Sequence, residues 1–150
     1  MITILKTAFD PWQSIVDYQQ QMNRDGEYGA CATFVGTMRD FNEGDQVNAM
    51  LLEHYPGMTE KYLEKTVVSA KQQWQLLDVL LIHRVGELLP NEPIVLVAAW
   101  SAHRKDAFEA CRFIMEDLKS KAPFWKKECF VEPDQQAQKN RWLAKNTSGY

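Results

Sequence analysis

Apolar residues recur along the chain at two spacings, which separate the expected strands from the expected helices. Short β-branched or alternating runs indicate strands at residues 2–6, 28–38, 47–55, 79–85, 94–100 and 126–131. Three- and four-residue spacing indicates helices at residues 11–24, 58–74 and 102–121. The nearly all-apolar run at 94–100 is typical of a strand in the middle of a sheet. The short Pro/Asn loop before it predicts a hairpin with 79–85.

Residues with capping chemistry mark where these helices begin and end. Asp10 precedes a proline and is expected to cap the first helix, and Ser101 is expected to cap the last. Pro123 ends the last helix because it lacks an amide hydrogen and favours extended geometry at the residue before it. Residues 132–145 predict either a weak polar helix or a tail that becomes ordered on binding, and 146–150 are expected to fray.

The composition is that of one ordinary globular domain over residues 1–150. The chain has 150 residues, of which 45% are hydrophobic and 25% charged, which suffices for one core. Its net charge of −3 argues against general binding to nucleic acid or to a membrane surface. No apolar run is long enough to span a membrane and the N-terminal segment lacks a signal-peptide core, so a cytoplasmic protein is expected.

Cysteine and histidine positions predict neither a metal site nor a cofactor. Cys31, Cys111 and Cys129 form no C-x-x-C pair, which fits buried, reduced core thiols. The alternative is a cysteine nucleophile or persulfide carrier, although no activating base stands beside any of the three. His83 and Arg84 are expected on alternate faces of their strand, with no site implied.

The segment from Met115 to Glu128 carries four lysines around an Ala-Pro-Phe-Trp hinge, a pattern that packing alone does not require. Lys119 approaches the hinge from the last helical turn, whereas Lys126 and Lys127 approach it from the strand that follows. Two ammonium groups can therefore converge on one small anionic or electrophilic group. The alternative is structural, because cations in a last helical turn favour the helix dipole and are common there.

Lys119 also shares a helical stripe with Arg104, Phe108, Cys111 and Met115. At roughly 100° per residue these five positions fall within about 80° of one another. The middle of the stripe is apolar and flanks the core, so Lys119 is expected at its margin, only partly solvated. Its ammonium should then lose a proton more readily than that of a free lysine. Such an amine acts as a base or as a nucleophile near neutral pH.

A second basic group stands at the other end of the same helix. His103, Arg104 and Lys105 place positive charge where the helix dipole and the free amides already favour anions. This pattern favours a phosphate or carboxylate docked at the helix start and held by backbone amides and Arg104. An ordinary surface turn is the alternative. Arg39, at the end of an expected strand, is either a further ligand contact or a solvated surface arginine.

Five blocks of sequence occur in an order and spacing that resemble a known family. They read VGTMRDFNEGDQV, LEHYPGMTEK, IHRVGEL, SAHRKDAFEA and LKSKAPFWKKE. They closely resemble the large, catalytic subunit of molybdopterin synthase over residues 28–128. The resemblance implies an α+β fold of the hammerhead type, with a mixed or antiparallel sheet packed by helices. It also implies a homodimer of these subunits with one small subunit at each end.

The activity that the resemblance implies is sulfur transfer. A cyclic pyranopterin monophosphate receives two sulfurs as a dithiolene and becomes molybdopterin. The sulfur donor is the C-terminal thiocarboxylate of a small ubiquitin-like subunit, whose Gly-Gly tail enters the pocket of the large subunit. No metal and no redox cofactor is needed for this chemistry. It requires an anion pocket, cations that polarise the acyl carbon, and a base or nucleophile.

The resemblance also assigns site residues. It implies that Lys119 and Lys126 are catalytic. The implied substrate-binding residues are Thr37, Met38, Arg39, His103, Arg104, Lys127 and Glu128. Thr37 departs from the family, which often has a lysine there. The tail departs too, because the family tends to carry a longer segment, with a Trp and a basic residue, that closes over the site. Arg141-Trp142 is the one pair here with those residue types.

Two other function classes remain open from the sequence. One is a non-catalytic module that binds a ubiquitin-like tail along the lysine-rich strip, which would form a complex without turnover. The other is a binder of single-stranded nucleic acid that stacks bases on Phe124 and Trp125. The acidic net charge speaks against the second class.

Overall fold

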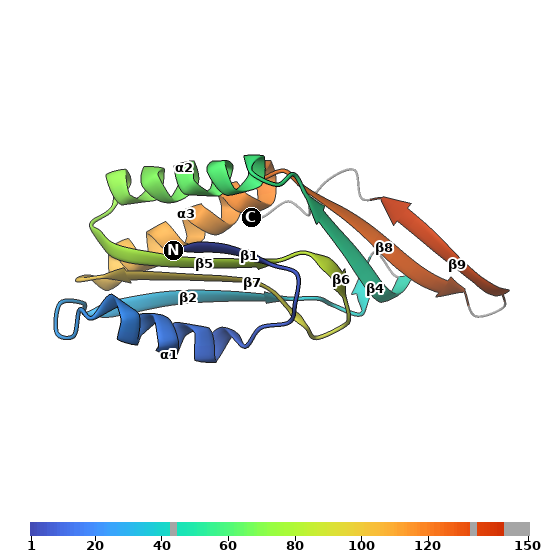
Figure 1. Ribbon diagram of the computed structural model, residues 1–150, viewed down its shortest axis with the longest axis horizontal. Coiled ribbons are helices and arrows are strands. Elements are labelled where there is room, and N and C mark those ends of the chain that lie inside the picture. The colour runs from blue at the N-terminus through green and yellow to red at the C-terminus, as the bar shows by residue number, and fades with distance from the viewer. Residues whose placement is uncertain (43–44, 133–134, 143–150) are drawn as a thin grey trace.

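A computed structural model describes residues 1–42, 45–132 and 135–142, and within these it describes the side chains outside residues 41–47 and 128–141. Figure 1 shows a sheet covered by helices and a second sheet that extends beyond its end. The described residues form an α+β fold, as expected. Two sheets are present where one was predicted. No helix of the described part of the chain is long and apolar enough to cross a membrane.

The first sheet has four strands in the order β1-β5-β7-β2. Their bounds are β1 Ile2–Leu5, β2 Ala30–Thr37, β5 Leu76–Arg84 and β7 Pro93–Ser101. The central pair β5 and β7 is the predicted hairpin, and β1 is the one strand that pairs in parallel. The last six residues of β5 and the last seven of β7 are buried, which explains the continuous apolar runs at 79–82 and 94–100.

Helices cover both faces of this sheet (Figure 1). The first, α1 Pro11–Met22, lies on one face, where Tyr18 and Trp100 pack with ring centroids 5.5 Å apart. The pair α2 Met58–Gln73 and α3 Arg104–Lys121 lies on the other face over the larger core. Asp10 caps α1 as predicted, because its carboxylate accepts hydrogen bonds from the Trp12 and Gln13 amides.

The second sheet contains β3 Phe41–Asn42, β4 Asp45–His54, β8 Phe124–Glu132 and β9 Gln135–Trp142 in that order, and β6 Gly86–Leu88 pairs with β4. A small core joins this sheet to the first one. Met38, Leu52 and Leu88 are its buried members, each no more than 1% exposed. The end of β2 is therefore packed directly against the second sheet.

Three sequence predictions need correction here. Residues 135–142, expected in a weak helix or a tail, form strand β9 because β8 offers them a pairing edge. Ser101 ends β7, and the N-cap of α3 is His103. Cys31, expected in the core, is exposed on edge strand β2, whereas Cys111 is buried. The side chain of Cys129 and residues 146–150 lie outside the described part of the chain.

Candidate functional site

The hinge between α3 and β8 is built as the sequence predicted. Leu118 and Ala122 are buried in the main core, and Ala122 has extended geometry before Pro123. Lys119 stands between them in the last helical turn and is half-buried. Because the core fixes the residues on either side of it, the backbone of Lys119 has little freedom.

A cluster around Asp117 braces the same turn against α2. Its Oδ2 accepts hydrogen bonds from Thr66 Oγ1 at 2.6 Å and Tyr62 Oη at 2.9 Å, and its Oδ1 accepts one from Lys121 Nζ at 2.7 Å. Burial favours a higher pKa for Asp117, but these hydrogen bonds outweigh it and hold the pKa below its usual value. The carboxylate is charged at neutral pH and links α3, which leads into the hinge, to α2.

Strand β8 separates Lys126 from Lys127. Lys126 pairs with Leu52 of β4, and Lys127 pairs with Leu51. Since successive residues of a strand point to opposite faces, the two lysines lie on opposite faces of the second sheet. Lys126 shares the face of Leu52, whereas Lys127 has its Nζ 5.7 Å from the centre of the Trp142 ring. Lys126 is therefore the lysine of β8 that faces the junction of the two sheets.

The end of β2 reaches this junction. Met38 is 1% exposed and packs with Leu52, the residue opposite Lys126. Its amide donates to the Glu92 carbonyl at 3.0 Å, and its carbonyl accepts from the Asn91 amide at 2.8 Å. Thr37 and Arg39 flank Met38 and are exposed. The structure thus brings Met38 against the residue opposite Lys126, and Thr37 and Arg39 lie exposed on either side of it.

An ion pair braces the loop that holds Met38. Arg84 is 7% exposed, and its Nη1 lies 2.9 Å from Glu92 Oε2. The contact is an ion pair between a buried guanidinium and a carboxylate. The Leu89 amide donates to the same oxygen at 2.7 Å. The Leu89 amide, followed by the Arg84 charge, lowers the pKa of Glu92. The loop is therefore fixed on both sides of the Met38 contact.

The start of α3 is open to solvent. His103, Arg104 and Lys105 are exposed, and His103 caps the helix without a side-chain hydrogen bond. Ser101 Oγ instead accepts from the His103 amide at 3.2 Å and donates to the Gln75 carbonyl at 2.8 Å. Basic side chains and the first-turn amides of α3 therefore face outward together, which suits an anion.

Gly29 fixes the peptide that leads into this helix start. Its amide donates to the Ser101 carbonyl at 3.1 Å. A Cβ placed on Gly29 would lie 2.5 Å from the Ala102 carbonyl oxygen, so any larger residue requires the backbone to move. The close approach of these two segments sets the position of His103 and Arg104.

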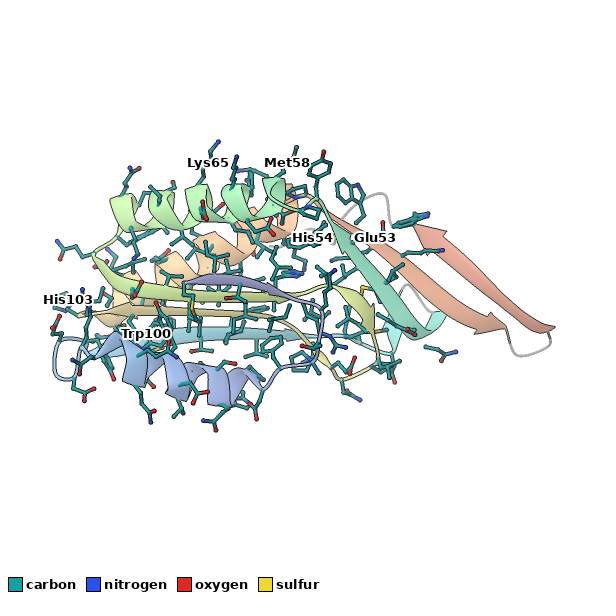
Figure 2. The ribbon with its side chains drawn as sticks, in the orientation of Figure 1. Glu53, His54, Met58, Lys65, Trp100 and His103 are labelled. Carbon is teal, nitrogen blue, oxygen red and sulfur yellow. The ribbon has the colours of Figure 1, made fainter. Side chains whose placement is uncertain are left out.

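The basic residues at the start of α3 and Lys119 lie at opposite ends of that helix. Arg104 and Lys119 are fifteen residues apart in α3, which at a rise of 1.5 Å per residue is about 22 Å. Figure 2 shows His103 at one end of the molecule and His54, next to the hinge, near its middle. Thr37, Met38 and Arg39 lie at the hinge end because β2 runs toward the second sheet. One chain alone therefore does not bring His103 and Arg104 to Lys119.

Glu128 is the remaining predicted site residue. It lies in β8 opposite Met50 of β4 and Arg141 of β9. Its side chain is outside the described set, so its place in the site stays a prediction.

Sequence reasoning implied no site at His83 or Arg84, and both are buried here. His83 is 4% exposed, and its ring stacks on Phe124 with centroids 3.9 Å apart and planes at 15°. Burial, with smaller effects from the charges of Lys126 and His54, lowers the pKa of His83 from 6.5 to about 4. Nothing in the local sequence of β5 signalled the contact of His83 with β8.

This burial predicts a pH dependence of stability. Between pH 6.5 and 4 His83 is protonated in the unfolded chain and neutral in the folded one. The free energy of unfolding should therefore decrease as the pH is lowered, by up to about 1.4 kcal/mol per pH unit. Asp78 and Asp117, whose pKa values are lowered, act at lower pH. Urea unfolding of the parent and of His83→Phe over pH 4–7 checks this. We expect a shallower slope in the variant, and equal slopes would contradict the prediction.

Comparison with known proteins identifies close relatives. The family model described as MoaE protein matches residues 8–121. The molybdopterin synthase catalytic subunit of Ralstonia nicotianae is 57% identical over 117 residues, which cover 78% of this chain and 63% of that protein. The protein of the same name from Pseudomonas aeruginosa is 50% identical over 131 residues, 87% of this chain and 85% of its own.

Solved structures agree with this picture. The molybdopterin biosynthesis MoaE protein from Burkholderia ambifaria is 46% identical, with a TM-score of 0.78 over 99% of this chain and 92% of that one. The complex of subunits 1 and 2 of molybdopterin-converting factor from Helicobacter pylori contains a chain of the same fold. It has a TM-score of 0.72 over 91% of this chain and 92% of that one, at 22% identity.

Proposed function

This chain belongs to the MoaE protein family, and from that premise we propose that it acts as the catalytic subunit of a molybdopterin synthase. It transfers sulfur from the C-terminal thiocarboxylate of a small ubiquitin-like subunit to a cyclic pyranopterin monophosphate, forming molybdopterin. One observation carries the assignment to particular residues. Lys119, in the last turn of α3, and Lys126, in β8, flank the hinge in the chain. Leu52, opposite Lys126, packs with Met38, the residue before Arg39.

The residues at the hinge can divide the chemistry between them. Each transfer breaks the C–S bond of the thiocarboxylate and forms a C–S bond to the pterin, where sulfur replaces an oxygen substituent. Water supplies the oxygen that leaves the small subunit ending in a carboxylate. Lys126, on the face of Leu52, acts as a fixed cation that stabilises charge on the acyl group. Lys119 accepts the proton or attacks the acyl carbon. Two such transfers build the dithiolene.

The substrate phosphate is held at the start of α3 by His103, Arg104 and the first-turn amides, and Arg39 contacts the substrate from the hinge side. Since Arg104 and Lys119 of one chain are about 22 Å apart, these contacts come from two copies of the chain. Exposed aromatic rings support such a dimer: Phe34 on edge strand β2 is 42% exposed and Phe108 on α3 is 66% exposed. Phe108 lies one helical turn from Arg104, so the apolar surface adjoins the anion site.

The partner is a small subunit that binds by its tail. The solved Helicobacter pylori assembly is named a complex of two subunits. In this chain Trp125 is 47% exposed beside the hinge, and Tyr55 and Met58 are 56% and 55% exposed at the junction of β4 and α2. An extended Gly-Gly tail can lie against such apolar surface and present its terminus to Lys119.

The proposed function predicts that the tail carries most of the activity. With a thiocarboxylated small subunit and the pyranopterin monophosphate, we expect dithiolene product. Removal of the last two glycines should abolish most of the product even if the globular contact survives. A full-length subunit ending in an ordinary carboxylate is the control, since it should bind without donating sulfur. A stable complex that yields no product from the thiocarboxylate would indicate a binding module instead.

Gly29→Ala should weaken substrate binding through the backbone. The added methyl group meets the Ala102 carbonyl oxygen at 2.5 Å, so the peptide before His103 must shift. We expect a loss of about 1–3 kcal/mol in stability and about tenfold in affinity for the pyranopterin monophosphate. Calorimetric titration and thermal unfolding measure both quantities.

Gly26→Ala is the matched control. Its φ of 83° strains any other residue, but a Cβ there meets no atom within 4 Å. It should lose stability and keep its affinity. Equal affinities in the two variants would show that Gly29 does not position the anion site.

A further inference from the structure

His83 lies in β5, and its hydrogen bonding fixes which ring nitrogen carries the proton. Its Nδ1 is 2.9 Å from the Arg84 carbonyl oxygen. A carbonyl only accepts, so Nδ1 is the donor. Since the ring is neutral at pH 7, Nε2 carries a lone pair and can only accept a hydrogen bond.

The stacking contact joins this ring to β8. Phe124, which stacks on His83, pairs with His54 of β4, and Lys126 pairs with Leu52. Residues two apart in a strand lie on one face, so Phe124 and Lys126 share the face that packs on His83. His54 lies directly opposite Phe124, and Lys126 is the next residue of β8 on the same face, so both belong to the strand surface that meets the imidazole.

The charged surroundings decide what a neutral ring does there. Lys126 comes from β8 and His54 from β4, and Glu60 of α2 reaches the group through His54, with Glu60 Oε1 3.7 Å from His54 Nε2. A protonated His83 would repel the Lys126 ammonium. A neutral ring can instead accept a hydrogen bond from that ammonium at Nε2.

We propose that His83 is a positioning residue for Lys126. It stacks under Phe124 to fix the start of β8 and offers Nε2 to the ammonium as an uncharged acceptor. The inference rests on the proposed function in one respect, the role of Lys126 as a cation in sulfur transfer. The chemistry of His83 itself concerns proton and hydrogen-bond geometry alone.

Three substitutions separate stacking from hydrogen bonding. His83→Phe keeps an aromatic ring and loses both nitrogens. His83→Asn keeps a donor for the Arg84 carbonyl but has no acceptor at the Nε2 position. His83→Gln places an amide near that position and restores an acceptor. Trp100→Phe is the control, because Trp100 is a fully buried ring on the opposite side of the first sheet, beneath α1.

The readout is the titration midpoint of Lys126, followed by the Cε chemical shift in full-length chain labelled with 13C-lysine and assigned with Lys126→Arg. We expect His83→Phe and His83→Asn to lower the midpoint by about one pH unit. His83→Gln should recover most of the shift, and Trp100→Phe should match the parent. In the reconstituted synthase, kcat should fall about tenfold in the first two variants with little change in KM.

Parental midpoints in both His83→Phe and His83→Asn would overturn the proposal, and so would equal losses in His83→Gln and His83→Phe. If His83→Phe does not fold, His83→Asn takes its place. The midpoint is measured without substrate, so it is independent of sulfur transfer. If the His83 variants shift the Lys126 midpoint but the reconstituted parent makes no product, the proposed function is refuted and this inference stands. If the midpoint does not move and the parent is active, this inference is refuted and the proposed function stands.

Discussion

Lys119→Arg is expected to be as inactive as Lys119→Ala, with both falling about 10²- to 10⁴-fold in kcat. An arginine keeps the positive charge and roughly the length of the lysine, but its guanidinium stays protonated and has no lone pair to give. If Lys119 accepts a proton or attacks the acyl carbon, charge alone does not replace it. Single-turnover kinetics with the thiocarboxylated small subunit measures the loss.

Two other lysines serve as comparisons. Lys126→Arg should retain measurable turnover, because a fixed cation remains on the same face of β8. Lys121→Ala should have a turnover close to that of the parent. Lys121 lies two residues from Lys119, but its side chain is 67% exposed and forms one surface ion pair, with Asp117. Near-parental turnover in Lys119→Arg would mean that Lys119 is only a fixed charge and that water or another group manages the proton.

The sequence predicted those parts of the fold that local chemistry determines. Asp10 caps α1, Pro123 ends α3, and the apolar runs of β5 and β7 form the central hairpin. Each of these depends on side chains within a few residues of one another. The family resemblance added the α+β hammerhead class, which the described residues confirm.

Features that depend on contacts between residues far apart in the sequence could not be predicted from local patterns. Strand β9 has a polar sequence and forms because β8 lies beside it. His83 contacts Phe124 across forty residues of chain, and no local pattern marks such a stack. Phe108, expected within an apolar stripe beside the core, is 66% exposed, because the buried stripe of α3 runs through Ala107, Ala110, Cys111, Ile114 and Leu118.

The candidate site shows the same division. Lys119, Lys126 and the end of β2 were each recognisable in the sequence, and the fold packs Met38, at the end of β2, with the residue opposite Lys126. The distance from Lys119 to His103 and Arg104 was not visible in a helical stripe, because a stripe gives the angle around the axis and hides the length along it. That length makes a second copy of the chain part of the proposed site.

A mixed dimer tests this shared site most directly. Arg104→Ala alone should weaken substrate binding by about 1.5–3 kcal/mol, and Lys119→Ala alone should lose turnover. Co-expression of the two variants with different tags allows purification of the dimer that holds one copy of each. If each site takes Arg104 from one copy and Lys119 from the other, one of the two sites in the mixed dimer is intact.

We therefore expect the mixed dimer to recover about half of the parental activity when assayed below the substrate concentration that saturates the Arg104→Ala variant. A mixed dimer of Lys119→Ala with Lys119→Arg is the control and should stay inactive. Recovery to about half would establish that the two ends of α3 serve one reaction across two chains. Activity no higher than that of the two separate variants would contradict the shared site and place both functions within a single chain.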